Sequence, residues 1–218
     1  MTKKPLSIMP LFANPLMEVQ LDLDLEKLTE FAFQMQNKDK KGIDRTNRGG
    51  WHSDLFNEGK YEEIIKHEEF IKLKKEINQY LQTYHLEIFR GMKFKEKVTQ
   101  NITNMWVNIN EKHHYNEWHI HGYSTLSGAY YIKHDGSVEN GDILFKHPKD
   151  LYMTVSHWPE GIAERGNEIT TAGMNATPKS NMLLIFPSWL EHRVEANLKN
   201  DSRISISFNS SPQLEKKS

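Results

Sequence analysis

Residues 116–132 read NEWHIHGYSTLSGAYYI, and they place two histidines, His119 and His121, one residue apart at the start of an apolar run. Side chains two residues apart on a β-strand point to the same face, so both imidazoles can address one ion. Neutral imidazole is the commonest protein ligand for first-row transition metals. The chain holds 11 histidines, however, so the pair alone leaves open a second interpretation, a polar edge on an ordinary strand.

Short apolar runs surround this stretch throughout the second half of the chain. They are rich in β-branched and aromatic residues and are bounded by Gly, Asn, Asp and Pro, a pattern typical of an all-β sandwich or barrel. The runs lie at residues 101–110, 116–123, 126–134, 141–148, 181–189 and 203–211. The polar segment 151–180 interrupts them, and a connection of this length is usually a functional flap or a disordered segment.

The first half of the chain shows helical periodicity after a short extended opening. Asp24 can cap a helix whose apolar stripe recurs at spacings of three and four. This stripe consists of Leu25, Leu28, Ala32 and Met35. A second helix is expected over about residues 60–86, with an apolar face made of Phe70, Leu73, Ile77, Leu81 and Tyr84. Both helices are amphipathic, so each is expected to cover a further layer of structure.

The composition limits the classes of function. The chain has 218 residues, 37% of them hydrophobic, which suffices for a substantial core. A net charge of -1 gives no electrostatic case for nucleic acid. The sequence has no cysteine, which excludes disulfides and thiolate ligands and suits an intracellular protein. No run approaches the roughly 20 apolar residues of a membrane span. We therefore expect a cytoplasmic protein with no membrane partner.

A third histidine favours the metal interpretation. His192 follows the apolar run at 181–189, within LLIFPSWLEHRVEAN. Two ligands on an early strand and one at the end of a late strand is the arrangement with which a double-stranded β-helix surrounds one ion. Three protein ligands on one face leave the opposite face open for substrate and dioxygen.

Arg203 opens the last apolar run, RISISFN. By alternation Arg203, Ser205 and Ser207 share a face, which is an unusual set for a core unless they contact an anion. A guanidinium binds a carboxylate through two parallel hydrogen bonds, so an inward arginine near the metal is interpreted as a carboxylate anchor. The alternative is an arginine at the rim, paired with Asp or Glu.

Together these motifs resemble those of the 2-oxoglutarate- and Fe(II)-dependent oxygenases, specifically a bacterial and phage family related to prolyl hydroxylases. The resemblance covers most of the chain. It rests on NRGGWHS, WVNIN, HIHGYSTLSGAYYI, GDILFKHP, LIFPSWLEHRVEAN and RISISFN. The last two are specific in combination, whereas any one motif alone is weak.

The resemblance implies a set of site residues. His119, position 121 and His192 correspond to the iron ligands, and Arg203 to the residue that binds the far carboxylate of 2-oxoglutarate. Tyr131, Ser205 and, more weakly, Asn108 are candidates for the same cosubstrate pocket.

Position 121 departs from the superfamily, which has Asp or Glu there. Three histidines make the iron centre more positive by one charge and invite competition from Zn(II). The alternative is that Glu117, on the same strand, supplies the carboxylate.

The expected fold is mainly β with N-terminal helices: a double-stranded β-helix (a cupin-like jelly roll) packed against a helical layer, in a single domain. Residues 1–94 would form the N-terminal strand and helical support, 95–210 the double-stranded β-helix and 211–218 a tail. Phe186 and Trp189 are candidate walls of the pocket, with core packing as the alternative.

The expected function is a dioxygenase that converts 2-oxoglutarate and O2 to succinate and CO2 while it hydroxylates a substrate, such as peptidyl proline, another amino-acid side chain or a small molecule. Trp51 and His52 would line the entrance or cap the helical layer. Two rival functions are a cupin-type three-His metalloenzyme that needs no 2-oxoglutarate and a non-catalytic jelly-roll binding module. The helical layer also permits a homodimer.

Overall fold

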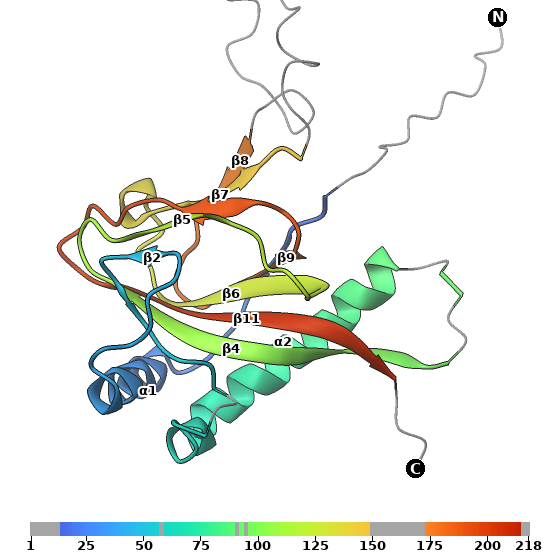
Figure 1. Ribbon diagram of the computed structural model, residues 1–218, viewed down its shortest axis with the longest axis horizontal. Helices are drawn as coiled ribbons and strands as arrows, with labels where there is room; N and C mark the ends of the chain where they lie inside the picture. Colours follow the sequence, from blue (N-terminus) through green and yellow to red (C-terminus); the bar gives the residue numbers. More distant parts are fainter. Residues whose placement is uncertain (1–13, 57–58, 90–91, 94–95, 149–172, 215–218) are drawn as a thin grey trace, which may run out of the picture.

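The structure is a computed structural model that describes residues 14–56, 59–89, 92–93, 96–148 and 173–214. It contains two antiparallel β-sheets that face each other, with two helices beneath the larger sheet (Figure 1). The strands are β1 (Met17–Gln20), β2 (Asn47–Arg48), β3 (Trp51–His52), β4 (Val98–Asn110), β5 (Tyr115–His119), β6 (Leu126–Lys133), β7 (Ile143–Lys146), β8 (Gly173–Ala176), β9 (Met182–Pro187), β10 (His192–Val194) and β11 (Arg203–Leu214). The larger sheet has the order β1-β9-β6-β11-β4-β3 and the smaller sheet the order β2-β5-β10-β7-β8. This is the jelly roll that the sequence predicts.

The two helices are α1 (Leu25–Lys38) and α2 (Glu68–Ile88). Asp24 caps α1 as predicted, because its Oδ1 accepts a hydrogen bond of 3.1 Å from the backbone N–H of Lys27. The second helix begins at Glu68, later than the predicted position near residue 60. A short 3-10 helix, η1 (Ile64–Lys66), precedes it, and the His67 side chain then caps α2.

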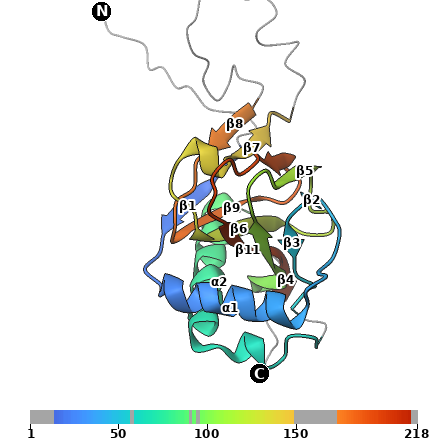
Figure 2. The same cartoon turned by 90° about the vertical axis from the view of Figure 1, so that its left-hand side faces the viewer.

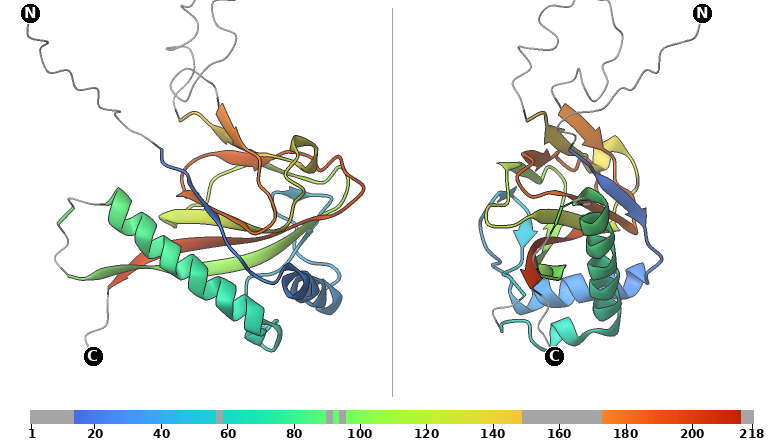
Figure 3. Two further views of the ribbon diagram at one scale, coloured as in Figure 1. Left: turned by 180° about the vertical axis from the view of Figure 1, so that it is seen from behind. Right: turned by 90° about the vertical axis from the view of Figure 1, so that its right-hand side faces the viewer.

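Both helices pack against the outer face of the larger sheet (Figures 2 and 3). The predicted apolar face of α2 is buried throughout. In the layer between the helices, the rings of Phe31 and Phe70 stack with centroids 4.7 Å apart. From the sheet, Ile204, Ile206 and Phe208 of β11 are fully buried in this same cluster. Alternation then turns Arg203, Ser205 and Ser207 toward the space between the two sheets, as the sequence predicts.

The N-terminal half contributes strands to both sheets, which corrects the predicted division near residue 94. β1 and β3 are edge strands of the larger sheet, and β2 is an edge strand of the smaller one. Strands of two residues, such as β2 and β3, carry no alternating pattern that a sequence could reveal. β11 also continues to Leu214, beyond the predicted end of the core at 210.

Most of the predicted flap, 151–180, lies outside the described residues. Its last part forms β8, which pairs with β7 at the edge of the smaller sheet. Among the helices that the structure describes, none is long and apolar enough to cross a membrane.

Candidate active site

A cavity of about 200 Å³ lies between the two sheets. The larger sheet contributes a row of four side chains from four neighbouring strands. His52 on β3 is paired with Asn108 on β4, Asn108 with Ser205 on β11, and Ser205 with Tyr131 on β6. All four line the cavity. The predicted cosubstrate residues Asn108, Ser205 and Tyr131 therefore lie side by side, which their separation in the sequence does not reveal.

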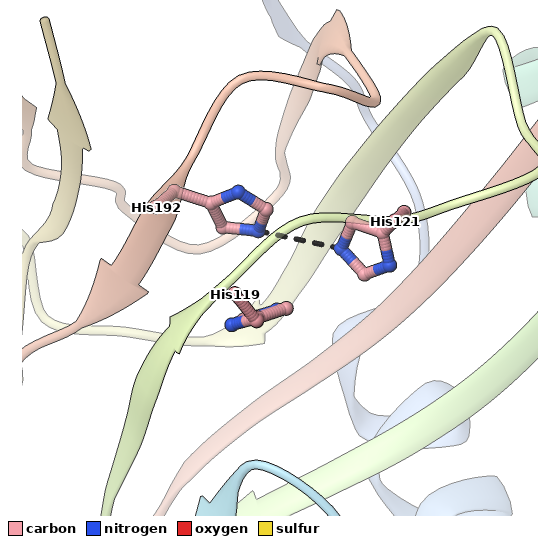
Figure 4. Close-up of side chains that lie close together, drawn as sticks. All are labelled: His119, His121 and His192. Atoms are coloured by element: carbon pink, nitrogen blue, oxygen red, sulfur yellow. Dashed lines mark hydrogen bonds between the residues drawn. The ribbon is translucent and has the colours of Figure 1, made fainter. Parts of the chain in front are cut away.

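The three predicted metal ligands meet at one end of this cavity, on the smaller sheet. His119 ends β5 and His192 begins β10, and the two residues are direct partners in the antiparallel register. His121 lies two residues beyond His119, where its backbone N–H donates to the Ser188 carbonyl at 2.9 Å. Figure 4 shows the three imidazoles turned toward one another.

The distances between these rings fit a shared metal ion. The Nε2 atoms of His121 and His192 are 3.3 Å apart, and one nitrogen of each histidine lies within 4.8 Å of the others. Two imidazole nitrogens that bind one ion at about 2.1 Å are separated by about 3.0–3.4 Å. Among the described residues, this is the one group of three or more histidine and acidic side chains that could hold a metal.

Hydrogen bonds fix which nitrogen faces the candidate metal position. Nδ1 of His119 lies 2.7 Å from the Glu117 carbonyl, and Nδ1 of His192 lies 2.8 Å from the Leu190 carbonyl. A carbonyl oxygen only accepts, so each Nδ1 carries the proton and each Nε2 keeps a free lone pair. Such outer contacts orient histidine ligands in known metal sites.

Burial keeps the imidazoles uncharged. It lowers the pKa of His121 to about 3, and it lowers the pKa values of His119 and His192 as well. His121 also packs on the indole of Trp106, with ring centroids 5.7 Å apart. Neutral, oriented imidazoles are the form that binds a first-row metal.

Glu117 does not complete this group. Between Asn116 and His119, β5 has one residue more than the facing segment of β10, which indicates a β-bulge. Asn116 and His119 consequently both line the cavity, whereas Glu117 faces outward and pairs with Arg48 at 2.7 Å. Its side chain is 46% exposed. The alternative ligand considered from the sequence is therefore not supported.

Arg203 is buried and reaches the cavity from β11. Its Nη1 donates to the carbonyls of Asn140 at 2.7 Å and Glu195 at 3.0 Å. Its Nη2 is buried with no hydrogen-bond partner among the described residues, and no described carboxylate pairs with the guanidinium. The alternative of a rim arginine paired with Asp or Glu is therefore wrong. Burial lowers the Arg203 pKa to about 10, so the group stays protonated at neutral pH.

A buried, unpaired cationic donor is costly, and a carboxylate at Nη2 would satisfy it. A second donor lies near it, because the Tyr131 hydroxyl is buried and has no hydrogen bond to a described residue. Asn108 Oδ1 is also buried without a described partner, but an amide oxygen accepts hydrogen bonds and so does not bind a carboxylate. Burial raises the pKa of Tyr131 to about 12, so its hydroxyl remains a donor. The donor set fits a dicarboxylate such as 2-oxoglutarate.

Because Gly141 has no side chain, the Arg203 guanidinium has room to lie against it. It has a φ of +96°, and a Cβ there would lie 2.0 Å from Arg203 Nη1 and 2.4 Å from the Glu195 carbonyl. We expect Gly141→Ala to displace the guanidinium, to destabilise the fold by roughly 1–3 kcal/mol and to weaken 2-oxoglutarate binding. Calorimetry with 2-oxoglutarate and a thermal melt measure both effects.

Gly59→Ala is the matched control, because Gly59 has a φ of +77° but an added Cβ there would meet no atom of the described, non-adjacent residues within 4 Å. This variant has the same strain from a positive φ, but its added Cβ does not come close to another residue. Equal 2-oxoglutarate affinity in both variants would contradict the role given to Gly141.

Of the remaining residues predicted for the wall and the entrance, some line the cavity and others do not. Phe186 lines the cavity and packs edge-on against His192 at 4.8 Å, and His52 also lines it. Trp189 does not, because a turn leaves its side chain 54% exposed and buries Leu190 instead. Trp51 belongs to the outer core, where its Nε1 donates to the Asp39 carbonyl.

Several cavity residues were not recognised from the sequence. They are Arg45, Thr46, Asn104, Trp106, Asn110, Asn116 and Asn209. Trp106 and Asn110 lie in the quoted WVNIN motif, and alternation with Asn108 could have identified them. Arg45 and Thr46 lie in a loop with no periodic signal. Their position follows only from the pairing of β2 with β5.

Comparisons with known proteins agree with this geometry. Residues 104–209 match the family described as "Putative 2OG-Fe(II) oxygenase". A search of curated proteins gives no match.

Solved structures share the fold at low sequence identity. A prolyl-4-hydroxylase from Pseudomonas putida has a TM-score of 0.57 and 11% identity, covering 91% of this chain and 93% of that one. A viral collagen prolyl hydroxylase from Paramecium bursaria chlorella virus-1, in complex with 2-oxoglutarate, has a TM-score of 0.51 and 13% identity, covering 90% and 96%. HygX from Streptomyces hygroscopicus, with nickel and 2-oxoglutarate bound, has a TM-score of 0.55 and 10% identity, covering 91% and 83%.

The family match begins within β4 and ends within β11, and it contains His119, His121, His192 and Arg203. The fold, the three-histidine group and this match agree on one class of protein. Residues 104–209, which carry these four side chains, match the family of putative 2OG-Fe(II) oxygenases, and the chain shares the fold of the prolyl hydroxylases.

Proposed function

We propose that this protein is a dioxygenase in which His119, His121 and His192 hold Fe(II) and Arg203 binds 2-oxoglutarate. The observation that carries the proposal is the shared cavity: three neutral imidazoles converge at one end, and a buried guanidinium with an unpaired Nη2 reaches into the same space. When bound, iron and 2-oxoglutarate would supply an oxidation that yields succinate and CO2 and hydroxylates the substrate.

Each residue has a defined task in this proposal. The Glu117 and Leu190 carbonyls hold the rings of His119 and His192 so that Nε2 faces the metal. Arg203, fixed through Nη1 by backbone carbonyls, offers Nη2 to the distal carboxylate of the cosubstrate. Tyr131 and Ser205, opposite each other on neighbouring strands, supply hydroxyl groups beside it. Phe186 and Trp106 exclude water from the metal side.

The three-histidine set has an electrostatic consequence. Neutral imidazoles leave both charges of Fe(II) uncompensated by the protein, whereas a carboxylate at position 121 would neutralise one of them. The same nitrogen set also suits Zn(II), which binds such sites with high affinity. We therefore propose that metal supply influences which ion occupies the site.

The experiment that tests the proposal is an anaerobic titration of metal-stripped protein, first with Fe(II) and then with 2-oxoglutarate. The visible charge-transfer band of the iron–2-oxoglutarate chelate is followed, and succinate is measured after oxygen is admitted. We expect saturable iron binding, then the band, then succinate.

Two other outcomes distinguish the rival functions. Iron binding without the band would favour a cupin-type three-His enzyme that does not use 2-oxoglutarate. No iron binding would favour a non-catalytic jelly-roll module. Both rivals leave the unpaired Arg203 Nη2 unexplained.

The substrate class proposed from the sequence is peptidyl proline, another amino-acid side chain or a small molecule. The homodimer and the cytoplasmic location also stay proposals. Light scattering coupled to gel filtration measures the mass of the particle, and a mass of 25.6 kDa would contradict the dimer.

A further inference from the structure

The charged side chains that line the cavity are all of one sign, positive. Its described lining contains two arginines, Arg45 and Arg203, and four histidines, and no Asp or Glu belongs to it. With Fe(II) bound, the two guanidinium groups and the metal carry four positive charges, and 2-oxoglutarate compensates two of them. This count rests on the proposed function. It leaves a filled site with an excess of positive charge.

The arginines of the described structure fall into two groups, those paired with carboxylates outside the cavity and those that line the cavity. Arg48 pairs with Glu117 at 2.7 Å and Asp44 at 3.0 Å, and Arg193 pairs with Glu195 at 2.5 Å. Both point away from the cavity lining. Arg45 and Arg203, the two that line the cavity, have no ion pair with any described carboxylate. Arg203 is explained by 2-oxoglutarate, whereas Arg45 has no assigned partner.

The backbone next to Arg45 is held by the neighbouring residues, whereas Arg45 itself is exposed at the rim of the cavity. The next residue, Thr46, accepts a backbone hydrogen bond of 3.0 Å from Glu117 on β5, and Asn47 then pairs with Asn116. This pairing fixes the loop against the strand that carries His119. Arg45 also lies near His52, at the β3 edge of the cavity.

The polar groups beside Arg45 are also unpaired. The Asn116 amide lines the cavity, is 9% exposed and makes no side-chain hydrogen bond to a described residue. The Thr46 hydroxyl likewise lines the cavity. A cation, an amide and a hydroxyl without partners among the described side chains form a donor set that suits an anionic group with several acceptor oxygens.

We propose that Arg45 binds an anionic group of the primary substrate, a carboxylate or a phosphate, while Arg203 binds 2-oxoglutarate. The substrate class is therefore acidic: the reacting carbon faces the three histidines, and the anion lies at the β2–β3 edge of the cavity. A neutral substrate would leave Arg45 without an ionic partner, and a cationic substrate would also add to the excess positive charge.

Calorimetric titration of the anaerobic Fe(II)–2-oxoglutarate complex tests this. The probes are N-acetylglycine and its neutral counterpart N-acetylglycinamide, which differ by one carboxylate charge. The wild-type protein is compared with Arg45→Gln and with Arg48→Gln. Arg48 is the matched control, because it lies three residues away on β2 and its replacement removes the same charge outside the cavity lining.

We expect wild type and Arg48→Gln to bind the acid at least about tenfold more tightly than the amide, since a hydrogen bond to a charged group is strong. Arg45→Gln should reduce this ratio to about one. A ratio near one in the wild type, or failure of the acid to bind, overturns the proposal. So does a ratio that persists in Arg45→Gln.

A failure of the Arg45 proposal can be distinguished from a failure of the proposed function. Binding of 2-oxoglutarate is measured beforehand on the same sample and depends on Arg203. If the chelate does not form, the same three proteins are titrated without metal or 2-oxoglutarate. The comparison of Arg45→Gln with Arg48→Gln then still reports on Arg45 alone.

Discussion

Arg203→Met weakens 2-oxoglutarate binding by roughly 30-fold to several thousand-fold and leaves iron binding intact. Truncating one partner of a buried, hydrogen-bonded charge pair costs about 2–5 kcal/mol. Arg203 meets that description, since it is 2% exposed and its Nη2 has no other partner in the part of the chain that the structure describes. Methionine preserves much of the apolar stem of the side chain. Calorimetry with 2-oxoglutarate on iron-loaded protein measures the loss.

Arg193→Met is the control for this experiment. Arg193 is 40% exposed and pairs with Glu195 on the protein surface, so its loss should leave 2-oxoglutarate affinity unchanged. Arg203 also binds backbone carbonyls through Nη1, so a thermal melt must accompany the measurement. A folded Arg203→Met protein with wild-type affinity for 2-oxoglutarate would place the carboxylate anchor elsewhere.

His192→Ala abolishes turnover and lowers iron affinity by at least about 100-fold. Loss of an outer residue that only orients a ligand already costs about 10–100-fold, and His192 would be a direct ligand. Its Nε2 lies 3.3 Å from that of His121, and its Nδ1 is fixed by the Leu190 carbonyl. Iron content after anaerobic loading and dialysis, with succinate formation, measures the effect.

His113→Asn is the matched control, because His113 is exposed and has a φ of +69°, a conformation that asparagine tolerates. It removes one histidine without touching the cavity. Iron retention in His192→Ala equal to that in His113→Asn would refute the three-histidine site.

The third ligand is tested by a pair of variants at positions 121 and 117. We expect His121→Ala to lose iron in the same assay, because the imidazole lies in the cavity and burial keeps its pKa near 3. We expect Glu117→Gln to retain iron, because the carboxylate pairs with Arg48 outside. The reverse result would show that the β-bulge in β5 is absent from the working enzyme.

The sequence predicted the local features of this site well. The two-residue spacing of His119 and His121, and the alternation that turns Arg203 inward from β11, depend only on strand geometry. The apolar faces of α1 and α2 follow from helical periodicity in the same way. Motif resemblance then indicated the family, which the match over residues 104–209 confirms.

Tertiary structure decided what depends on the neighbours of each strand. One extra residue in β5 turns Glu117 outward, a turn after β9 exposes Trp189, and the pairing of β2 with β5 brings Arg45 to the cavity. Periodicity is a property of a single segment and can be read from the chain. Register, bulges and the approach of loops are set by contacts between residues far apart in sequence, and only the folded protein shows them.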